Sequence, residues 1–406
     1  MSGILGAKSK HSHPSMLAAP AATRAACLRF DCRASLVVMS DVMRVGPLAE
    51  RHIALRAKFG PFGGWEMPIE YAGAGVLAEY RAVRTTVGLF DVSHMGTLVV
   101  RGPGAADAAQ ALHRILTNNV AGLAPGRAQY NLLCEPLGGV IDDVISYRRV
   151  DEVVIVPNAG NVRSVRDAIR QWLPEGVTVT DLSADTAILA VQGPRSAEVL
   201  SALGLPADLD YLGFVDTTGP DEGPVLVART GYTGEHGYEL IIPVRDAGKW
   251  WDCVHAGVVA EGGSAAGLGA RDLLRTEMGY PLYGHELSPT ISPVQAGLGW
   301  AVSWVKPQFC GRSALIAERE AGPKSRLRAL RCTGRGIARA GMAVATEHGP
   351  GEVTSGTFSP ALGGGIALAL LPGEVELGAD VVIDIRGRAC AATVVRAPFV
   401  PADPRR

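Results

Sequence analysis

The sequence predicts a mixed α+β protein of more than one domain that ends in a small β-barrel or sandwich. The chain has 406 residues, which is too long for one hydrophobic core and suggests two or three domains. Strand-like and helix-like stretches alternate over residues 127–200. From about Arg326, the pattern becomes short strands separated by Gly and Pro turns, which is typical of barrels and sandwiches.

The individual elements follow from the spacing of apolar residues. Helices are expected where apolar residues recur every three to four positions, and strands where β-branched and aromatic residues run together between turn residues. The expected helices cover residues 48–59, 76–86, 106–116, 247–261 and 270–279. The expected strands cover 97–101 and 140–146, together with 225–229 and 238–243, which form a hairpin around the loop 231–237.

Residues 1–45 differ in composition from the rest of the chain. They are rich in Ala, Ser and basic residues, and their only acids are Asp31 and Asp41. This composition is typical of an organellar transit peptide. It also fits an upstream stretch placed before a true start at Met39 or Met43, which we favour. Both interpretations predict a disordered leader; the first implies the mitochondrial matrix, and the second predicts a cytoplasmic protein.

Composition and missing motifs exclude several functions. The formal net charge is −1, so the overall charge favours neither nucleic acid nor a membrane surface as a partner. No apolar stretch reaches roughly 18 residues, the length of a membrane-spanning helix. The seven cysteines include no Cys-x-x-Cys pair, which predicts thiols in a reducing compartment and no metal site. Nucleotide-binding motifs are absent as well, because the glycine-rich stretch 73–78 has no buried strand before it.

The strongest candidate for a catalytic group is a pair of carboxylates inside an apolar run. Asp142 and Asp143 interrupt a β-branched stretch just after the turn Gly138-Gly139. Buried carboxylates are costly, so such a position requires a reason. Side chains alternate along a strand, so the two should point to opposite faces, which favours one working carboxylate over an acid–base pair. In the alternative interpretation, one Asp caps the turn and the other is solvated.

Three further polar residues lie in apolar surroundings. Glu239 lies on the expected strand 238–243, where an unpaired carboxylate requires a partner. Arg271 lies at the start of the expected helix 270–279, and a structural ion pair between Glu239 and Arg271 is one explanation for both residues. His94 lies in a turn between apolar segments, where a single histidine is more often structural than catalytic. The residues alone leave the roles of Glu239 and Arg271 open.

Seven motifs occur in a fixed order along the chain. They are Gly64-Trp65-Glu66-Met67-Pro68, Gly88-Leu89-Phe90-Asp91-Val92-Ser93-His94-Met95-Gly96, Gly138-Gly139-Val140-Ile141-Asp142-Asp143, Arg229-Thr230-Gly231-Tyr232-Thr233-Gly234-Glu235, Ala266-Gly267-Leu268-Gly269-Ala270-Arg271-Asp272, Arg275-Thr276-Glu277 and Thr354-Ser355-Gly356-Thr357-Phe358-Ser359-Pro360. In this order they resemble the aminomethyltransferase family, the T-proteins of the glycine cleavage system. The resemblance runs from about Pro47 to the C-terminus.

The resemblance implies three domains arranged like a cloverleaf around a central folate site. The chain would then divide into a leader over 1–45, a first α+β folate-binding domain over 46–101 and 184–284, a second α+β domain with the catalytic Asp over 102–183, a connecting segment over 285–325 and a C-terminal β-barrel over 326–406. The family fold therefore agrees with the α+β prediction made from the spacing of residues.

The resemblance also assigns roles to residues. The catalytic aspartate would be Asp143, the second carboxylate of the Gly-Gly-x-x-Asp-Asp motif. Glu239 would bind the pterin ring, and Arg271 matches the arginine of the family motif. The remaining folate-site positions would be Tyr130, Tyr147, Asn158 and Tyr232, with Arg405 as the C-terminal basic residue that reaches folate.

The implied reaction is transfer of an aminomethyl carbon from the lipoyl arm of H-protein to tetrahydrofolate. Its products would be 5,10-methylenetetrahydrofolate, ammonia and dihydrolipoyl H-protein. Tetrahydrofolate would be a co-substrate, and neither a metal nor a nucleotide is required. The expected partners are therefore lipoylated H-protein and tetrahydrofolate, with no nucleic acid and no membrane.

Three other functions are compatible with the implied fold. Folate-dependent demethylases and oxidases resemble the chain, but an oxidase would need a flavin domain, which has no counterpart here. Iron–sulfur assembly relatives carry a Cys-containing motif and lack the catalytic carboxylate, whereas Asp143 is present. A folate-binding scaffold without catalysis remains open.

Six basic residues without an intervening acid gather near the start of the expected barrel. They are Lys324, Arg326, Arg328, Arg331, Arg335 and Arg339. Such a cluster can protect a solvated barrel edge, or it can bind an acidic partner such as the H-protein of the resemblance. The sequence leaves both interpretations open.

Overall fold

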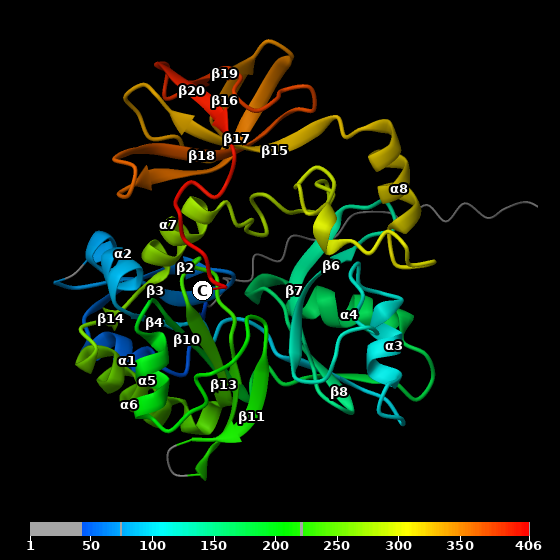
Figure 1. Ribbon diagram of the computed structural model, residues 1–406, viewed down its shortest axis with the longest axis vertical. Helices are drawn as coiled ribbons and strands as arrows, with labels where there is room; N and C mark the ends of the chain where they lie inside the picture. Colours follow the sequence, from blue (N-terminus) through cyan, green and yellow to red (C-terminus); the bar gives the residue numbers. More distant parts are fainter. Residues whose placement is uncertain (1–42, 74, 220–221, 406) are drawn as a thin grey trace, which may run out of the picture. The chain divides into compact units, whose positions relative to one another are not determined.

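The computed structural model describes residues 43–73, 75–219 and 222–405, and it confirms the mixed α/β fold (Figure 1). Up to residue 42, the expected leader lies outside the described residues. Arg44–Val45, also assigned to that leader, form strand β1 and pair with β3 (Trp65–Tyr71). The folded chain consists of two large sheets, this small β1–β3–β2 sheet and a closed barrel.

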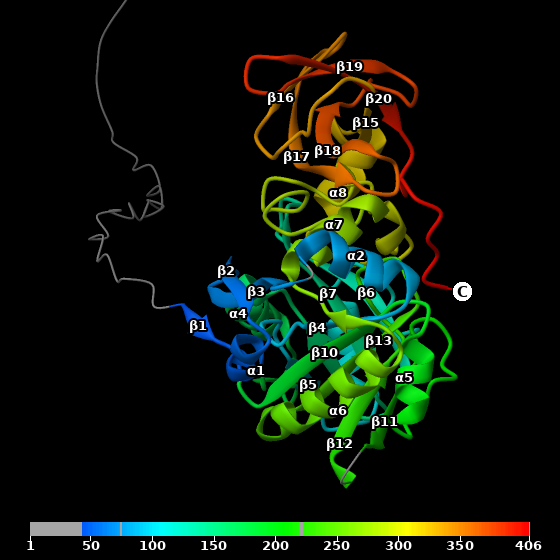
Figure 2. The same ribbon diagram turned by 90° about the vertical axis from the view of Figure 1, so that its left-hand side faces the viewer.

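The first large sheet separates two apolar cores. Its strand order is β11 (Phe214–Thr218), β12 (Pro224–Ala228), β13 (Gly237–Pro243), β10 (Thr186–Gln192), β4 (Gly88–Asp91) and β14 (Ser264–Ala265). On β10, Leu189 and Val191 face α5 (Ser196–Ala202) and α6 (Ala247–Ala260), which lie beside each other on one face (Figure 2). The alternate residues Ile188 and Ala190 face the core that contains α2 (Gly75–Thr85) and α7 (Leu268–Met278). The period of two is what a strand buried on both faces requires.

The second large sheet packs against the first. Its strand order is β6 (Arg127–Cys134), β7 (Val140–Arg148), β8 (Glu152–Val156), β5 (Leu98–Arg101) and β9 (Thr178–Asp181). One face is covered by α3 (Asp107–His113) and α4 (Val162–Trp172), with Leu112 and Ile169 in their shared core. The other face contributes Tyr147 and Val154 to the core that also contains Ile188 of the first sheet. The two sheets therefore meet in one apolar layer.

The whole second sheet is inserted in the sequence between β4 and β10, which are neighbouring strands of the first sheet. Strand β4 ends at Asp91, and β10 returns antiparallel beside it, with Asp91 paired to Leu189. All strands of the second sheet lie between these two positions in the sequence.

The C-terminal strands close into the expected barrel. Around the barrel, the order is β15 (Ser325–Cys332), β18 (Gly364–Pro372), β17 (Gly349–Ser359), β16 (Ala343–Thr346), β19 (Asp380–Asp384) and β20 (Ala389–Val395). Two hydrogen bonds join β17 to α7. Arg275 Nη2 donates to Ser355 Oγ at 2.7 Å, and Ser359 Oγ donates to Glu277 Oε1 at 2.5 Å.

The helix expected over residues 48–59 is correct only in its first half. Helix α1 (Ala49–Ala54) ends early, and β2 (Ala57–Phe62) pairs antiparallel with β3. The chain reverses at Gly63 and Gly64, whose φ angles are 57° and 84°, a region that glycine enters without a steric penalty. Pairing with β3 therefore outweighs the helical spacing. The other expected helices and strands occur within a few residues of their expected bounds.

Candidate active site where the two sheets meet

The carboxylate pair lies on β7 directly after the turn from β6. Gly139 in this turn has no room for a side chain, because a Cβ would lie 1.8 Å from the carbonyl oxygen of Pro289. The register of the two strands leaves Ile141 as the extra residue of a β-bulge just before Asp142 and Asp143. Bulges change the direction of neighbouring side chains, and this one precedes both carboxylates.

Both carboxylates bind the same amide group, although strand alternation predicted that they would point apart. Asn158 Nδ2 donates to Asp142 Oδ1 at 2.9 Å and to Asp143 Oδ1 at 2.8 Å. Asp142 also accepts from the backbone N–H of Asn158 at 2.9 Å and from Nδ2 of Asn161 at 2.7 Å. The Tyr130 hydroxyl donates to Asp143 Oδ2 at 3.0 Å. The two carboxylates therefore share one amide donor, although Asp142 is buried and Asp143 is half-buried.

Burial controls the charge of this pair. Asp142 is completely buried, and burial, followed by the charge of Asp143, raises the pKa of its carboxyl group. Burial also raises the pKa of Asp143, against hydrogen bonds from Tyr130 and Asn158 that lower it. Within the described ranges, no Lys, Arg or His forms an ion pair with either carboxylate. The pair therefore takes up protons at a higher pH than ordinary carboxyl groups do.

Glu239 on β13 is held by two hydroxyl groups. Thr230 Oγ1 donates to Glu239 Oε2 at 2.6 Å, and the Tyr147 hydroxyl donates to the same oxygen at 3.3 Å. Tyr147 belongs to β7, the strand of Asp143, so this contact joins the two sheets. The ion pair with Arg271 that the sequence left open is not among the contacts of the described residues. Among the described residues, therefore, the hydrogen bonds to the Glu239 carboxylate come from neutral groups.

Arg271 in the first turn of α7 lies over an aromatic ring. Its guanidinium carbon is 4.7 Å from the centroid of the Tyr232 ring. Its Nη1 is buried and has no hydrogen-bond partner among the described residues, so a ligand with an acceptor could satisfy it. His94 is buried edge-on to Phe62, and burial, followed by the charge of Arg271, lowers its pKa to about 4. The neutral His94 ring packs on Phe62, while its Nδ1 is buried and has no hydrogen-bond partner among the described residues.

The C-terminal segment returns to this region. The guanidinium carbon of Arg405 is 5.9 Å from the centroid of the Tyr211 ring. Tyr280 lies close by, with its ring 5.7 Å from that of Tyr232. Burial raises the pKa of Tyr280 to about 12, and Arg405 opposes that rise. Tyr211 and Tyr280 are aromatic neighbours of the site that the sequence analysis did not find.

Trp300 was also missed. Its ring stacks on that of Tyr130, with centroids 5.3 Å apart and planes at 28°, and the side chain is 68% exposed. The segment that carries Trp300 is anchored by buried Lys306, whose Nζ donates to the carbonyl oxygens of Leu116 at 2.5 Å and Asn118 at 2.9 Å. An aromatic residue after a Gly-Leu-Gly run was the only signal available in the sequence.

Seven of the eight predicted site residues form three contacting groups. The groups are Asp143 with Tyr130 and Asn158, Glu239 with Tyr147, and Arg271 with Tyr232, whereas Arg405 contacts Tyr211, which was not predicted. Electrostatic effects connect these groups. Burial raises the pKa of Tyr232, which Asp143 and Arg271 also influence, and burial lowers the pKa of Arg271 against the charge of Glu239. The carboxylates of Asp143 and Glu239, one from each sheet, therefore lie in the surroundings of Tyr232 and Arg271.

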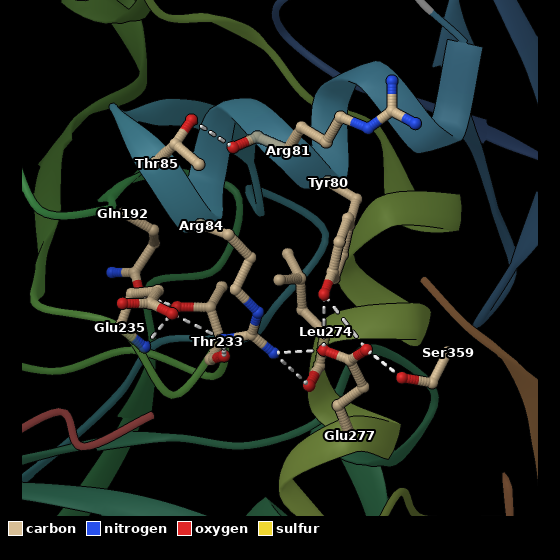
Figure 3. A network of polar contacts seen from close by, with 10 residues as sticks. All are labelled: Tyr80, Arg81, Arg84, Thr85, Gln192, Thr233, Glu235, Leu274, Glu277 and Ser359. Atoms are coloured by element: carbon tan, nitrogen blue, oxygen red, sulfur yellow. Dashed lines mark hydrogen bonds and ion pairs between the residues drawn. The ribbon is translucent and has the colours of Figure 1, made fainter. Parts of the chain in front are cut away.

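A second polar cluster joins α2 and α7 to the barrel (Figure 3). Buried Glu277 accepts from the Tyr80 hydroxyl at 3.0 Å, from Arg84 Nη2 at 2.8 Å and from Ser359. Arg84 Nη1 donates to Glu235 at 2.8 Å. A cavity of about 570 Å³ beside the cluster is lined in part by Tyr80, Arg84 and the C-terminal segment, and none of the eight predicted site residues lines it.

Among the described residues, buried carboxylates that form no ion pair lie near tyrosines and arginines, a setting typical of an enzyme active site. The model of the GCVT N-terminal domain matches residues 48–306, and that of the glycine cleavage T-protein C-terminal barrel domain matches residues 326–401. The chain therefore belongs to the aminomethyltransferase family, the T-proteins of glycine cleavage, and it is a transferase.

Individual relatives agree. An aminomethyltransferase of Mycobacterium avium (strain 104) is 54% identical over 359 residues, which cover 87% of this chain and 96% of that protein. Another, of Parafrankia sp. (strain EAN1pec), is 55% identical over 366 residues, covering 89% and 99%. The crystal structure of glycine cleavage system aminomethyltransferase T from Bartonella henselae is 33% identical, with a TM-score of 0.82 and coverage of 89% and 99%.

In residues 43–73, 75–219 and 222–405, no helix is both long and apolar enough to cross a membrane. Over the same part of the chain, no group of three or more His, Cys, Asp or Glu side chains is placed to hold a metal ion. Cys134, Cys332 and Cys390 are buried free thiols, in agreement with their expected use as small apolar side chains.

Proposed function

We propose that the protein transfers the aminomethyl carbon from the lipoyl arm of H-protein to tetrahydrofolate, with Asp143 as the catalytic carboxylate. The products are 5,10-methylenetetrahydrofolate, ammonia and dihydrolipoyl H-protein. The observation that carries the proposal is the setting of Asp143, a half-buried carboxylate that forms no ion pair with a described residue and that Tyr130 and Asn158 hold in place.

Asp143 supplies the chemistry in this proposal. Its carboxylate accepts a hydrogen bond from a folate N–H, which makes that nitrogen a better nucleophile. Its negative charge also stabilises the positive charge that develops on the carbon being transferred. Burial strengthens both effects, because the local dielectric constant is lower than that of water.

Glu239 and Arg271 suit the pterin ring. The Glu239 carboxylate can accept from the neighbouring N–H donors of the ring as a bidentate partner. Arg271 brings a buried Nη1 without a partner among the described residues, which an acceptor on the ring would satisfy. In this proposal Tyr147 acts through Glu239, because its hydroxyl donates to that carboxylate.

The other assignments belong to the same proposal. Tyr130, Tyr232 and Arg405 would line the folate site, and Asn158 would hold the carboxylate pair rather than present a free amide. The domain boundaries near 102, 184, 285 and 326 and a cytoplasmic location are part of it too, and the relatives named above are bacterial.

The basic cluster is the proposed docking surface for acidic H-protein. Arg326 and Arg328 are half-buried, and Arg328 Nε donates to the carbonyl oxygen of Val375 at 2.8 Å. Lys324 and Arg331 are exposed, so they can meet a partner with less rearrangement. Charge reversal at these two positions should raise KM for H-protein at low salt, with a smaller effect at high salt.

The test of function is ammonia release from aminomethyl-lipoyl H-protein by the purified full-length protein and tetrahydrofolate. The release should require both reactants and should be accompanied by 5,10-methylenetetrahydrofolate. Asp143→Asn should bind tetrahydrofolate but lose transfer on the order of 10²-fold or more. A wild-type protein that binds tetrahydrofolate and releases no ammonia would support the scaffold interpretation instead.

A further inference from the structure

Asp142 and Asp143 differ in the kinds of hydrogen bond they accept. All three donors to Asp142 are N–H groups, two from Asn158 and one from Asn161. An amide N–H can only donate, so these contacts favour the ionised form of Asp142. The Tyr130 hydroxyl at Asp143 Oδ2 can accept as well as donate. If Asp143 Oδ2 is protonated, it can donate to the Tyr130 hydroxyl, so their contact is kept. If Asp142 is protonated, none of its three N–H partners can accept the proton.

The groups that face the pair do not neutralise it. Tyr130 on β6 and Tyr283, a few residues after α7, lie near the Asp142 carboxylate, and Tyr232 lies near that of Asp143. Across the described ranges, ion-pair contacts from Lys, Arg or His to the two carboxylates are absent. Because both carboxylates bind one Nδ2 atom, ionising both places two negative charges close together away from water, which is unfavourable.

Burial and hydrogen bonding favour opposite locations for the remaining proton. Burial alone would leave it on Asp142, the more deeply buried member. The three N–H donors oppose this, because they stabilise negative charge on Asp142. The hydrogen bonds decide the location and leave the proton on Asp143, because a carboxylate with several N–H donors can keep its charge even when buried.

We propose that Asp142 is a positioning residue that holds a fixed negative charge beside Asp143 and thereby strengthens Asp143 as a proton acceptor at neutral pH. The inference rests on the proposed function, in which Asp143 meets the substrate. An isolated carboxylate, with a pKa near 4, is a weak proton acceptor at pH 7. A neighbouring negative charge raises its affinity for protons.

The proton balance of the transfer requires such an acceptor. The overall reaction breaks two N–H bonds, one C–N bond and one C–S bond, and it forms two N–C bonds. The two released protons go to the departing nitrogen and sulfur, giving ammonia and a thiol. Asp143 takes up one of these protons and passes it on, so its charge is the same before and after turnover.

The first test is the dependence of kcat on pH. Asp142→Asn removes the neighbouring charge, so the acid limb of the profile should move to lower pH by roughly one to two units. Asn161→Ala removes one N–H donor from Asp142, makes Asp142 easier to protonate, and should cause a smaller shift in the same direction. KM for tetrahydrofolate should change less than about twofold in both variants. The matched control is Asp167→Asn on the exposed face of α4, which should leave the profile unchanged.

The second test needs no turnover. In protein with ¹³C-labelled aspartate side chains and no substrate, the titration midpoint of Asp143 should be lower in Asp142→Asn than in the wild type. A midpoint that stays the same or rises in the folded variants overturns the inference. Should Asp142→Asn fail to fold, Asn161→Ala decides the question alone. A wild type without transfer activity that still shows the midpoint shift would refute the proposed function and not the coupling of the two carboxylates.

Discussion

At the scale of single residues, Glu239 stands out because its partners are neutral. Thr230 and Tyr147 both donate to Oε2, and no hydrogen bond of the described residues reaches Oε1. A carboxylate fixed in this way is oriented without being neutralised. It can therefore offer a charged acceptor to an incoming ligand at little reorganisation cost.

Glu239→Gln should weaken tetrahydrofolate binding more than it slows the chemical step. A charge-assisted hydrogen bond contributes roughly 1.5–3 kcal/mol, and glutamine cannot replace both acceptor oxygens. Calorimetric titration with tetrahydrofolate measures the loss, and Glu347→Gln on the exposed β16–β17 turn is the matched control. Equal affinity in wild type and Glu239→Gln would remove Glu239 from the folate site.

The carboxylate pair should also make folding stability depend on pH. Burial raises the pKa at which the carboxylate pair gives up its shared proton in the folded state, so the pair stabilises the fold below the usual carboxyl pKa near 4 and loses that contribution as pH rises through the raised pKa. From pH 5 to pH 8, the unfolding free energy of Asp142→Asn should therefore fall less than that of the wild type, by on the order of 1–3 kcal/mol. Guanidinium unfolding at both pH values measures this difference, and parallel changes in the two proteins would contradict it.

At the scale of elements, the connecting segment positions Trp300 over the site. Thr117 Oγ1 donates to the carbonyl oxygen of Ala301 at 2.8 Å, and Lys306 Nζ binds two carbonyl oxygens of the turn that precedes β6. Because that turn is joined to β6 by hydrogen bonds between Thr117 and Leu132, the segment and the strand of Tyr130 are held as one piece.

Lys306→Met should lower the free energy of unfolding by weakening the attachment of the connecting segment to β6. The substitution keeps most of the apolar stem but leaves the carbonyl oxygens of Leu116 and Asn118 without the ammonium donor, which costs about 1–3 kcal/mol. Urea unfolding measures the loss, and exposed Lys324→Met is the control for removing a charge. An unchanged unfolding midpoint in Lys306→Met would show that the segment is held by its backbone contacts alone.

The elements show where reasoning from sequence succeeds and where it stops. Residues 76–86, 247–261 and 270–279 were correctly expected to be helical, because their apolar spacing and their tertiary packing agree. Residues 57–59 were wrongly expected to be helical, because pairing with β3 decides their conformation. The bulge at Ile141 could not be predicted from the sequence either, because a single extra residue in a strand leaves the apolar pattern almost unchanged.

At the scale of the whole molecule, Glu277 joins parts of the chain that are distant in sequence. It accepts from Tyr80 and Arg84 on α2 and from Ser359 on β17, and its backbone carbonyl accepts from the N–H of Phe399 at 2.8 Å. Helix α2 and the barrel therefore share one buried carboxylate, and the C-terminal segment binds the backbone of the same residue. Its position could not be predicted, because the motif Arg275-Thr276-Glu277 gives no sign of partners roughly 80–200 residues away.

Glu277→Ala should destabilise the protein far more than Ser359→Ala. Removing the buried carboxylate leaves the Arg84 guanidinium poorly neutralised, which costs roughly 3–5 kcal/mol. Ser359→Ala removes one neutral donor and should cost about 1 kcal/mol. Chemical unfolding compares the two, and hydrogen exchange in β17 should increase in both. Equal losses would show that Glu277 contributes no more than a single ordinary hydrogen bond.

The pairing of Asp91 with Leu189 has a consequence for the order of folding. It closes a loop of about a hundred residues, and closing so long a loop before its interior is compact carries a large entropic penalty. Once β5 to β9 have collapsed onto α3 and α4, the ends of the loop are already near each other, and β10 can join β4 at a much smaller loss of chain entropy. Asp143 lies within this loop, and Glu239 lies on the first sheet outside it. The two carboxylates should therefore come together only in a late step of folding. Refolding followed by the fluorescence of a bound folate analogue should accordingly lag behind the recovery of secondary structure.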